Sequence, residues 1–231
     1  MGDQNPNGIL VIDKPKGMTS HDVVNAARRL FKIKKVGHAG TLDPIATGIL
    51  IILVGKATKK SSQLMTADKE YNVTMRLGET TETGDAEGAV IRTAPIAGIT
   101  ADKIVKTMSD FVGVIEQIPP MYSAVKFKGR SLYKLARKGI SVARKPRPVM
   151  IEKIDIRDIN LPYVRFEVVC GKGTYIRQLC TDIGEKLGCG AHMTSLRRTR
   201  AGDYRISQAK RIDELAKLTE DELGNLLIRT D

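Results

Sequence analysis

The sequence has 231 residues, which allows one large domain or two small ones, and 42% of them are hydrophobic, enough for a packed core. The 38 Lys and Arg residues exceed the 26 Asp and Glu residues, and the formal charge of +12 favours a polyanionic partner, RNA or DNA before anionic lipid. Lipid binding is disfavoured because the chain lacks Trp and lacks a basic amphipathic helix with bulky apolar anchors. With no signal-peptide pattern and no apolar run of roughly 18 residues, we expect a cytoplasmic protein without a membrane span.

The first third of the chain predicts a strand, a helix and a second strand. Residues 8–13 are typical of a strand, and Ser20 is expected to cap the helix that follows. The apolar face of that helix, at helical spacing, comprises Val23, Val24, Ala27, Leu30 and Phe31. Residues 49–54 are apolar without interruption and predict a buried strand.

One carboxylate stands alone in the loop between this helix and the buried strand. Asp43 is the only acidic residue in the interval 23–67, which also holds eight basic residues. Asp before Pro is a common turn residue, because its side chain bonds to backbone N–H groups two residues on. Alternatively, the glycines on both sides of Asp43 let the backbone bend and let a ligand approach, so that the loop holds a catalytic carboxylate.

The middle of the chain predicts a strand, a loop and a helix. Residues 71–77 alternate between apolar and polar, as a half-buried strand requires, and core packing is one interpretation of Tyr71. Residues 79–88 are rich in Thr, Gly and acidic residues and predict a surface loop in which Asp85 serves local turns. A helix opening near Thr100 is expected to turn three apolar side chains inward: Ile104, Val105 and Met108.

A long basic segment follows. Residues 117–151 contain no acidic side chain, and residues 126–147 carry nine basic ones. A run of charge is usually a solvated, mobile loop. Here the absence of counter-charge over 35 residues favours an arm that binds a phosphate backbone, with a short helix over residues 131–138.

The last third predicts another half-buried strand over residues 163–168, then a helix capped by Thr174. Residues 194–205 carry several arginines and form a candidate backbone-contacting strand or loop. The tail from Ser207 is expected to be helical, with a capping box at Thr219. Helical and alternating stretches mix irregularly, so the fold class is α+β.

Three cysteines fit a reducing compartment: Cys170, Cys180 and Cys189. Cys189 and His192 have a spacing that a metal site uses, but two further ligands at matching spacing are missing. We therefore interpret the cysteines as buried thiols and expect no metal.

Several motifs occur in a fixed order. Around Asp43 the sequence reads His38-Ala-Gly-Thr-Leu-Asp43-Pro-Ile-Ala-Thr-Gly48, preceded by Lys14-Pro15-Lys-Gly17-Met-Thr19-Ser20. Later blocks are Lys69-Glu-Tyr71, Gly171-Lys-Gly173-Thr-Tyr175-Ile-Arg177 and Leu196-Arg197-Arg198-Thr199. In order and spacing, from about Gly8 to Gly202, the chain resembles the bacterial TruB family, the tRNA pseudouridine-55 synthases.

The resemblance implies an isomerase without a cofactor and a pseudouridine synthase fold, which is a mixed, largely antiparallel sheet with flanking helices and a central catalytic cleft. We expect a catalytic domain over residues 1–206, with residues 126–147 as an inserted RNA-binding loop, and a short helical tail over residues 207–231. Bacterial relatives usually continue into a small RNA-binding PUA domain, which we expect to be absent because no residues remain for it.

The resemblance also assigns site residues. Asp43 would be the nucleophile, Tyr71 would stack on the base and handle the C5 proton, and Arg177 would pair with the carboxylate. Four residues would line or flank the pocket: Lys14, His38, Tyr175 and Leu196. For His38 and Leu196 a purely structural role is the alternative. RNA-contacting cations are expected in the basic loop and the last motif: Lys126, Lys128, Arg130, Lys134, Arg137, Lys138, Arg197 and Arg198.

The implied reaction is isomerisation of the T-loop uridine of tRNA, at position 55, after the base leaves its stack. We expect a monomer that binds the tRNA T-arm and needs no protein partner. One alternative is a tRNA-binding and folding chaperone that acts without chemistry. Another is a nucleic-acid-binding protein in which Asp43 is only structural. The combination of Asp43, Tyr71 and Arg177 favours catalysis.

Overall fold

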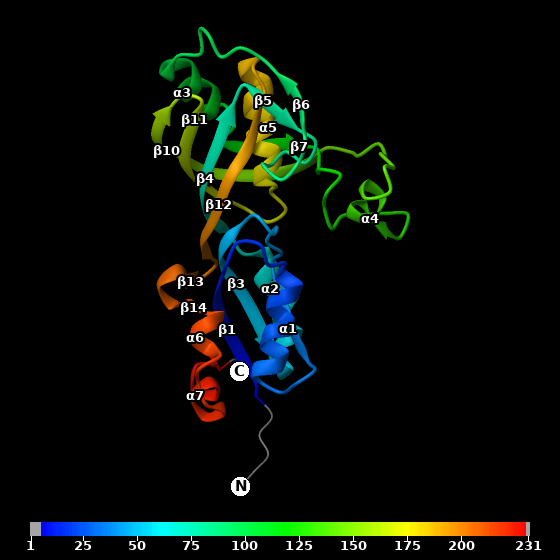
Figure 1. Cartoon of the computed structure of the whole chain (residues 1–231), viewed down its shortest axis with the longest axis vertical. Helices are drawn as coiled ribbons and strands as arrows, with labels where there is room; N and C mark the ends of the chain where they lie inside the picture. The colour runs from blue at the N-terminus through cyan, green and yellow to red at the C-terminus, as the bar shows by residue number, and fades with distance from the viewer. Residues whose placement is uncertain (1–5, 230–231) are drawn as a thin grey trace. The chain divides into compact units, whose positions relative to one another are not determined.

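A computed structural model describes residues 6–229 and divides the chain into two compact units. Unit 1 contains the chain up to Tyr71 and again from Leu196 onward, and unit 2 contains Asn72–Ser195. Two strands carry the chain from one unit into the other, β4 (Lys69–Leu77) and β12 (Ala191–Ala201) (Figure 1). Each unit has its own paired strands and its own helices.

Unit 1 is built on a central antiparallel pair of strands. β1 (Gly8–Lys14) and β3 (Thr47–Val54) pair along their full lengths, and strand order in this unit is β14–β1–β3–β12. β3 also runs parallel to the end of β12, with Gly48 opposite Arg198. The remaining elements are α1 (Ser20–Leu30), β2 (Val36–Ala39), η1 (Gly55–Lys60), α2 (Ser61–Thr66), β13 (Tyr204–Arg205), η2 (Ile206–Gln208), β14 (Lys210–Arg211), α6 (Ile212–Leu215) and α7 (Glu220–Asn225).

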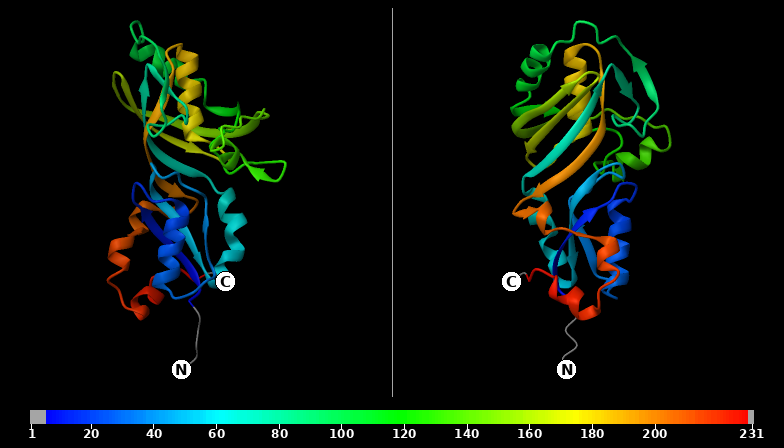
Figure 2. Two further views of the ribbon diagram at one scale, coloured as in Figure 1. Left: turned by 45° about the vertical axis from the view of Figure 1, so that its right-hand side comes forward. Right: turned by 60° about the vertical axis from the view of Figure 1, so that its left-hand side comes forward.

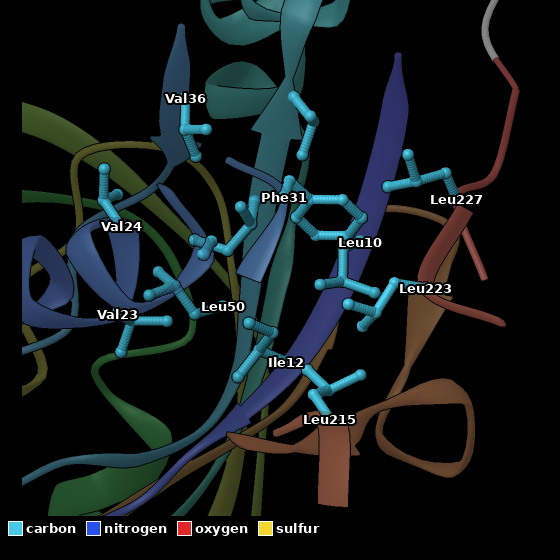
Figure 3. Packing of buried hydrophobic residues seen from close by; sticks show 13 residues of the cluster. Leu10, Ile12, Val23, Val24, Phe31, Val36, Leu50, Leu215, Leu223 and Leu227 are labelled. Carbon is cyan, nitrogen blue, oxygen red and sulfur yellow. The ribbon is translucent and has the colours of Figure 1, made fainter. Parts of the chain in front are cut away.

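Both faces of the β1–β3 pair are covered by apolar side chains. One face packs against α1, α6 and α7, so that side chains from the two ends of the sequence meet (Figure 3). Its buried members include Leu10, Ile12, Val23, Phe31, Leu50, Leu215, Leu223 and Leu227. The opposite face buries Ile9, Val11, Ile49, Ile51, Leu53, Ala57 and Ala201. Because successive strand residues point to opposite faces, two covered faces explain why residues 49–54 are apolar without alternation.

Unit 2 continues with strands in the order β12–β4–β11–β10–β7. β10 (Arg147–Asn160) is antiparallel to both β11 (Tyr163–Cys170) and β7 (Gly113–Gln117). α3 (Ala101–Ser109) packs against α5 (Ile176–Leu187), as both views in Figure 2 show. Two small hairpins pair β5 (Glu79–Thr81) with β6 (Val90–Thr93) and β8 (Lys126–Phe127) with β9 (Arg130–Ser131), and the second leads into α4 (Leu132–Ala136).

Most of the predicted elements are confirmed, and so is the α+β class with its mixed, largely antiparallel pairing. The two alternating stretches are strands whose apolar sides are buried: Val73, Met75 and Leu77 in β4, and Val164, Phe166 and Val168 in β11. The short helix in the basic segment is α4, and Thr219 forms the expected capping box at α7. Among residues 6–229, no helix combines the length and the apolar character that crossing a membrane requires.

The predicted cap of α1 is wrong by one residue. Thr19 is the N-cap: its hydroxyl accepts a hydrogen bond from Asp22 N at 3.1 Å, and the Asp22 carboxylate accepts one from Thr19 N at 2.8 Å. This reciprocal pair is a capping box, although Asp takes the place of the usual Glu or Gln. Ser20 is the first residue of the helix, and its hydroxyl bonds to Leu42 instead.

Three further predictions differ from the structure. Thr174 does not cap α5, because the N-cap is Tyr175, which makes no side-chain cap bond. Val105 in α3 is 50% exposed rather than turned inward. Residues 79–88 are more than a surface loop: they begin with β5, and Asp85 is buried in a pairing that depends on residues far along the chain.

Candidate functional site

The predicted site residues fall into one group in each unit. Unit 1 contains Asp43, Tyr71, Lys14, His38, Leu196, Arg197 and Arg198, and unit 2 contains Tyr175, Arg177, Lys126, Lys128, Arg130, Lys134, Arg137 and Lys138.

The core of the first group is the loop of residues 40–46, which joins β2 to β3 and carries Asp43. Asp43 is half-buried, and its carbonyl accepts a hydrogen bond from Ala46 N at 3.1 Å, which closes a turn. The turn interpretation of Asp43 therefore describes its backbone, whose carbonyl closes the turn.

A buried arginine supports this loop. Arg198 is 1% exposed, and its guanidinium donates to the carbonyl oxygens of Ile49 at 2.7 Å and Gly40 at 3.0 Å. Arg198 was predicted to contact RNA, but a side chain enclosed in this way does not present its charge to a phosphate. Its bonds tie the start of the Asp43 loop to strand β12.

Lys14 is also enclosed. Its ammonium donates to the carbonyl oxygens of Met18 at 2.7 Å, Pro15 at 2.9 Å and Pro44 at 3.3 Å. The last of these bonds reaches the residue directly after Asp43. Lys14, which was predicted to flank the pocket, thus makes a cation-to-carbonyl contact with the Asp43 loop from strand β1.

Gly48 allows the close approach of the strand that carries Arg198. Gly48 has φ +97°, and a Cβ built there would lie 2.2 Å from Arg198 O and 2.7 Å from Arg198 N. Only glycine fits this position, because both atoms are backbone and cannot swing aside. The glycine in the motif is therefore explained by β3 pairing with β12.

His38 lies half-buried in β2. Burial, together with the positive charge of Arg198 and of His21, lowers the pKa of His38 below its ordinary value, so the neutral imidazole is favoured at neutral pH. Its Nδ1 is buried and has no hydrogen-bond partner among residues 6–229.

The remaining predicted residues of unit 1 differ in exposure. Tyr71 and Leu196 are both buried. Arg197 is partly exposed and forms a two-pronged ion pair with Asp13, with Nη2–Oδ2 and Nη1–Oδ1 distances of 2.7 and 3.1 Å. Arg197 thus keeps a solvent-facing charge, unlike its neighbour Arg198.

In unit 2, Arg177 is the centre of a buried network. It is 5% exposed and donates to the carbonyl oxygens of Tyr122 at 2.7 Å and Thr83 at 2.8 Å. Its Nε also lies 3.5 Å from an oxygen of Asp85, whose carboxylate is equally buried. Arg177 is therefore enclosed within unit 2 and paired with a carboxylate that is far away in the sequence.

Sequence reasoning missed two residues that bond predicted site residues of unit 2, Asp85 beside Arg177 and Gln117 beside Tyr175. Asp85 was assigned to local turns, which it does serve, since it accepts bonds from Thr83 Oγ1 at 2.5 Å and Glu87 N at 3.1 Å. Gln117 was not considered, yet it bonds Tyr175 in both directions, at 2.8 Å to the N–H and 3.2 Å to the carbonyl. No local pattern marks either residue, because the partners lie more than fifty positions away.

The cations of the basic segment are exposed. All six predicted there face solvent: Lys126, Lys128, Arg130, Lys134, Arg137 and Lys138. The segment is anchored by Leu132 and Leu135, which are buried, and by an edge-to-face contact of Tyr122 with Tyr133 at 6.3 Å. A folded base with exposed cations suits contact with a phosphate backbone.

The three cysteines are buried. Cys170, Cys180 and Cys189 are buried thiols, as expected, and burial raises the pKa of Cys180 far above its ordinary value. In the part of the chain that the structure describes, no group of three or more His, Cys, Asp and Glu side chains is arranged to hold a metal ion.

The fold is that of the pseudouridine synthases. A chain in the crystal structure of a Cbf5–Nop10–Gar1 complex superposes with a TM-score of 0.72 at 34% identity, over 96% of this chain and 58% of that chain. A chain in an archaeal box H/ACA sRNP Nop10–Cbf5 complex gives a TM-score of 0.71 at 29% identity, over 96% of this chain and 60% of that one. The present chain thus spans less than two thirds of these structural relatives.

Sequence comparison agrees with the fold. The model of the TruB family pseudouridylate synthase N-terminal domain matches residues 28–176, and that of the tRNA pseudouridylate synthase B C-terminal domain matches residues 177–229. Proteins named tRNA pseudouridine synthase B are 50% identical in Dechloromonas aromatica and 47% identical in Haemophilus influenzae, over 95% and 97% of this chain and 73% of each relative. The chain belongs to the TruB family of pseudouridylate synthases, and it is an isomerase that makes pseudouridine.

Proposed function

We propose that this enzyme converts the T-loop uridine of tRNA, at position 55, into pseudouridine, with Asp43 as the nucleophile. The observation that carries the proposal is the rigid support of the Asp43 loop, which is tied at Gly40 and at Pro44 by buried cations. Relatives that are 46–50% identical and are named tRNA pseudouridine synthase B support tRNA as the substrate.

The reaction needs few chemical groups. The bond between ribose C1′ and uracil N1 breaks, the base turns, and C1′ rejoins the base through C5. The proton on C5 leaves and N1 gains one, so product and substrate are isomers, and the net change requires neither a redox partner nor a group donor. What is required is a nucleophile or base beside the sugar and an enclosure that retains the detached uracil.

Asp43 suits the role of the nucleophile beside the sugar. The proposal assigns Tyr71 and Arg177 to supporting roles in the reaction. Tyr71 stacks on the uracil, a contact worth about 1–3 kcal/mol per base, and takes part in the transfer of the C5 proton on the way to the aromatic product. The family resemblance assigns Arg177 to act together with the Asp43 carboxylate. Tyr175 and Leu196 line the base pocket, and His38 helps to hold the everted nucleotide.

Binding of the tRNA T-arm is assigned to exposed cations. The basic segment supplies six of them, and Arg197 supplies another from the last motif. Eversion of the uridine costs a few kcal/mol, which backbone contacts of this kind help to offset. In this assignment Arg198 and Lys14 support the Asp43 loop from inside, in place of the RNA-binding and pocket-flanking roles predicted for them. The enzyme acts as a cytoplasmic monomer without a protein partner.

The test is incubation of the protein with an unmodified tRNA transcript, followed by mapping of pseudouridine, with Asp43→Ala beside wild type. We expect modification of the T-loop uridine by wild type, no modification by the variant, and nearly unchanged tRNA binding. Activity in the folded variant would remove Asp43 from the mechanism. Loss of both binding and activity in a folded variant would point to a structural Asp43, and tRNA refolding without modification by wild type would point to a chaperone.

A further inference from the structure

We infer that Ser20 is a positioning residue for the reaction, because its hydroxyl holds both peptide groups of Leu42, the residue directly before Asp43. The inference rests on the proposed role of Asp43. Ser20 belongs to α1 and Leu42 to the loop between β2 and β3, so the contact joins two elements that are 22 positions apart. Both residues belong to unit 1.

The contact is reciprocal. The Ser20 hydroxyl accepts a hydrogen bond from Leu42 N at 2.8 Å and donates one to Leu42 O at 3.0 Å. The side chain is 3% exposed, so water is excluded from the pair. A hydroxyl has one proton and two lone pairs, and it is therefore the smallest side chain that satisfies a backbone donor and a backbone acceptor together.

These two bonds act on the peptide that leads into Asp43. The carbonyl of Leu42 lies in the same planar peptide group as the N–H of Asp43. Fixing that carbonyl therefore fixes the plane from which the Asp43 side chain projects. The rotation still open to Asp43 is limited on the other side, where Pro44 O accepts bonds from Gly17 N at 2.8 Å and from Lys14 Nζ at 3.3 Å.

The bonds of Ser20 are not explained by the needs of its own helix. Thr19, the exposed neighbour, supplies the N-cap of α1 together with Asp22. The Ser20 hydroxyl makes no contact with the helix terminus that would replace this cap, and its described hydrogen bonds both go to Leu42. Two adjacent hydroxyls thus have separate tasks, one at the helix end and one at the Asp43 loop.

This separation provides a matched pair of variants. Thr19→Ala removes the cap and lowers the stability of α1, but leaves the contact with Leu42 in place. Ser20→Ala leaves the cap but removes both bonds to Leu42. We expect Ser20→Ala to lower the single-turnover rate of pseudouridine formation by about ten- to a hundredfold, because small misplacements of a reacting group have effects of this size. Thr19→Ala should leave that rate within about twofold of wild type, and neither variant should change the dissociation constant for tRNA.

Hydrogen exchange of the Leu42 amide gives a readout independent of activity. In wild type this amide should exchange slowly, whereas in Ser20→Ala it should exchange much faster and in Thr19→Ala only as far as global stability falls. Ser20→Cys, which keeps a small side chain with weaker hydrogen-bonding capacity, should give an intermediate rate of both exchange and reaction.

The outcomes separate this inference from the proposed function. If wild type modifies tRNA but Ser20→Ala reacts as fast as Thr19→Ala, the positioning role is wrong and the function stands. If the Leu42 amide of wild type exchanges as fast as that of exposed Thr41, the contact itself is absent, whether or not Ser20→Ala folds. If wild type modifies no tRNA while the Leu42 amide is protected, the proposed function is wrong, and the contact of Ser20 with Leu42 has no role in catalysis.

Discussion

Replacing Gly48 by Ala tests whether strand β3 lies as close to β12 as the structure places it. The methyl group would lie 2.2 Å from Arg198 O and 2.7 Å from Arg198 N, well inside van der Waals contact, and Gly48 has φ +97°. The backbone strain costs about 1–2 kcal/mol and overpacking against an immobile neighbour another 1–3 kcal/mol. We therefore expect the free energy of unfolding to fall by about 2–5 kcal/mol.

Gly17→Ala is the matched control in the same unit. Gly17 has φ +88°, and a Cβ there meets nothing within 4 Å, so this variant carries the strain without the clash. Urea unfolding of wild type and of both variants measures how much unfolding free energy each substitution costs, provided that all three proteins show the same dependence of unfolding free energy on urea concentration. The difference between the variants, about 1–3 kcal/mol, isolates the contact with β12. Equal losses would refute the close approach, and with it the explanation of why glycine occupies this position.

Three further predictions concern other sites. The pKa of His38 is lowered in the folded protein, so below a pH of about 6.5 the unfolded chain binds a proton that the folded chain excludes, and wild type should lose stability as the pH falls. His38→Gln should abolish this loss, which urea unfolding at pH 5 and pH 8 measures; an equal loss in the variant would contradict the prediction. Asp85→Ala should lower the unfolding free energy by about 3 kcal/mol, because it breaks a buried ion pair with Arg177. Asp155→Ala, which breaks an exposed ion pair, should change the unfolding free energy little, and equal effects of the two variants would contradict the buried network around Arg177. In tRNA-binding titrations, Lys134→Gln and Arg137→Gln should each reduce the slope of log affinity against log salt by about 0.7–0.9 if each cation contacts one phosphate, while an unchanged slope would place them outside the RNA interface.

Local patterns identified the elements that depend only on neighbouring residues. The alternation in residues 71–77 and 163–168 predicted strands, since a strand with one buried face needs a period of two. The uninterrupted apolar residues 49–54 predicted a buried strand, and the structure explains them by a core on each face. Helix caps were less predictable, because Thr19 and Ser20 have equivalent capping chemistry and differ only in where the first turn begins.

Burial of charge is the feature of the site that the sequence did not reveal. Lys14 was predicted to flank the pocket, Arg198 to contact RNA and Arg177 to pair with the carboxylate. All three are enclosed and bonded to backbone carbonyls. A cationic residue in a sequence is predicted to be exposed, because burying its charge costs free energy unless hydrogen-bonding partners surround it. Those partners come from other elements, so their presence is invisible until the strands are paired.

The sequence by itself determined the family, the strands and the solitary carboxylate at position 43, because motif order, alternation and charge distribution are properties of residues close together along the chain. Only the tertiary structure decided that Arg198 and Ser20 support the loop of that carboxylate, and that Asp85 accompanies Arg177. The physical reason is that a hydrogen bond or ion pair depends on distance in space, and these partners lie between 22 and 158 positions apart.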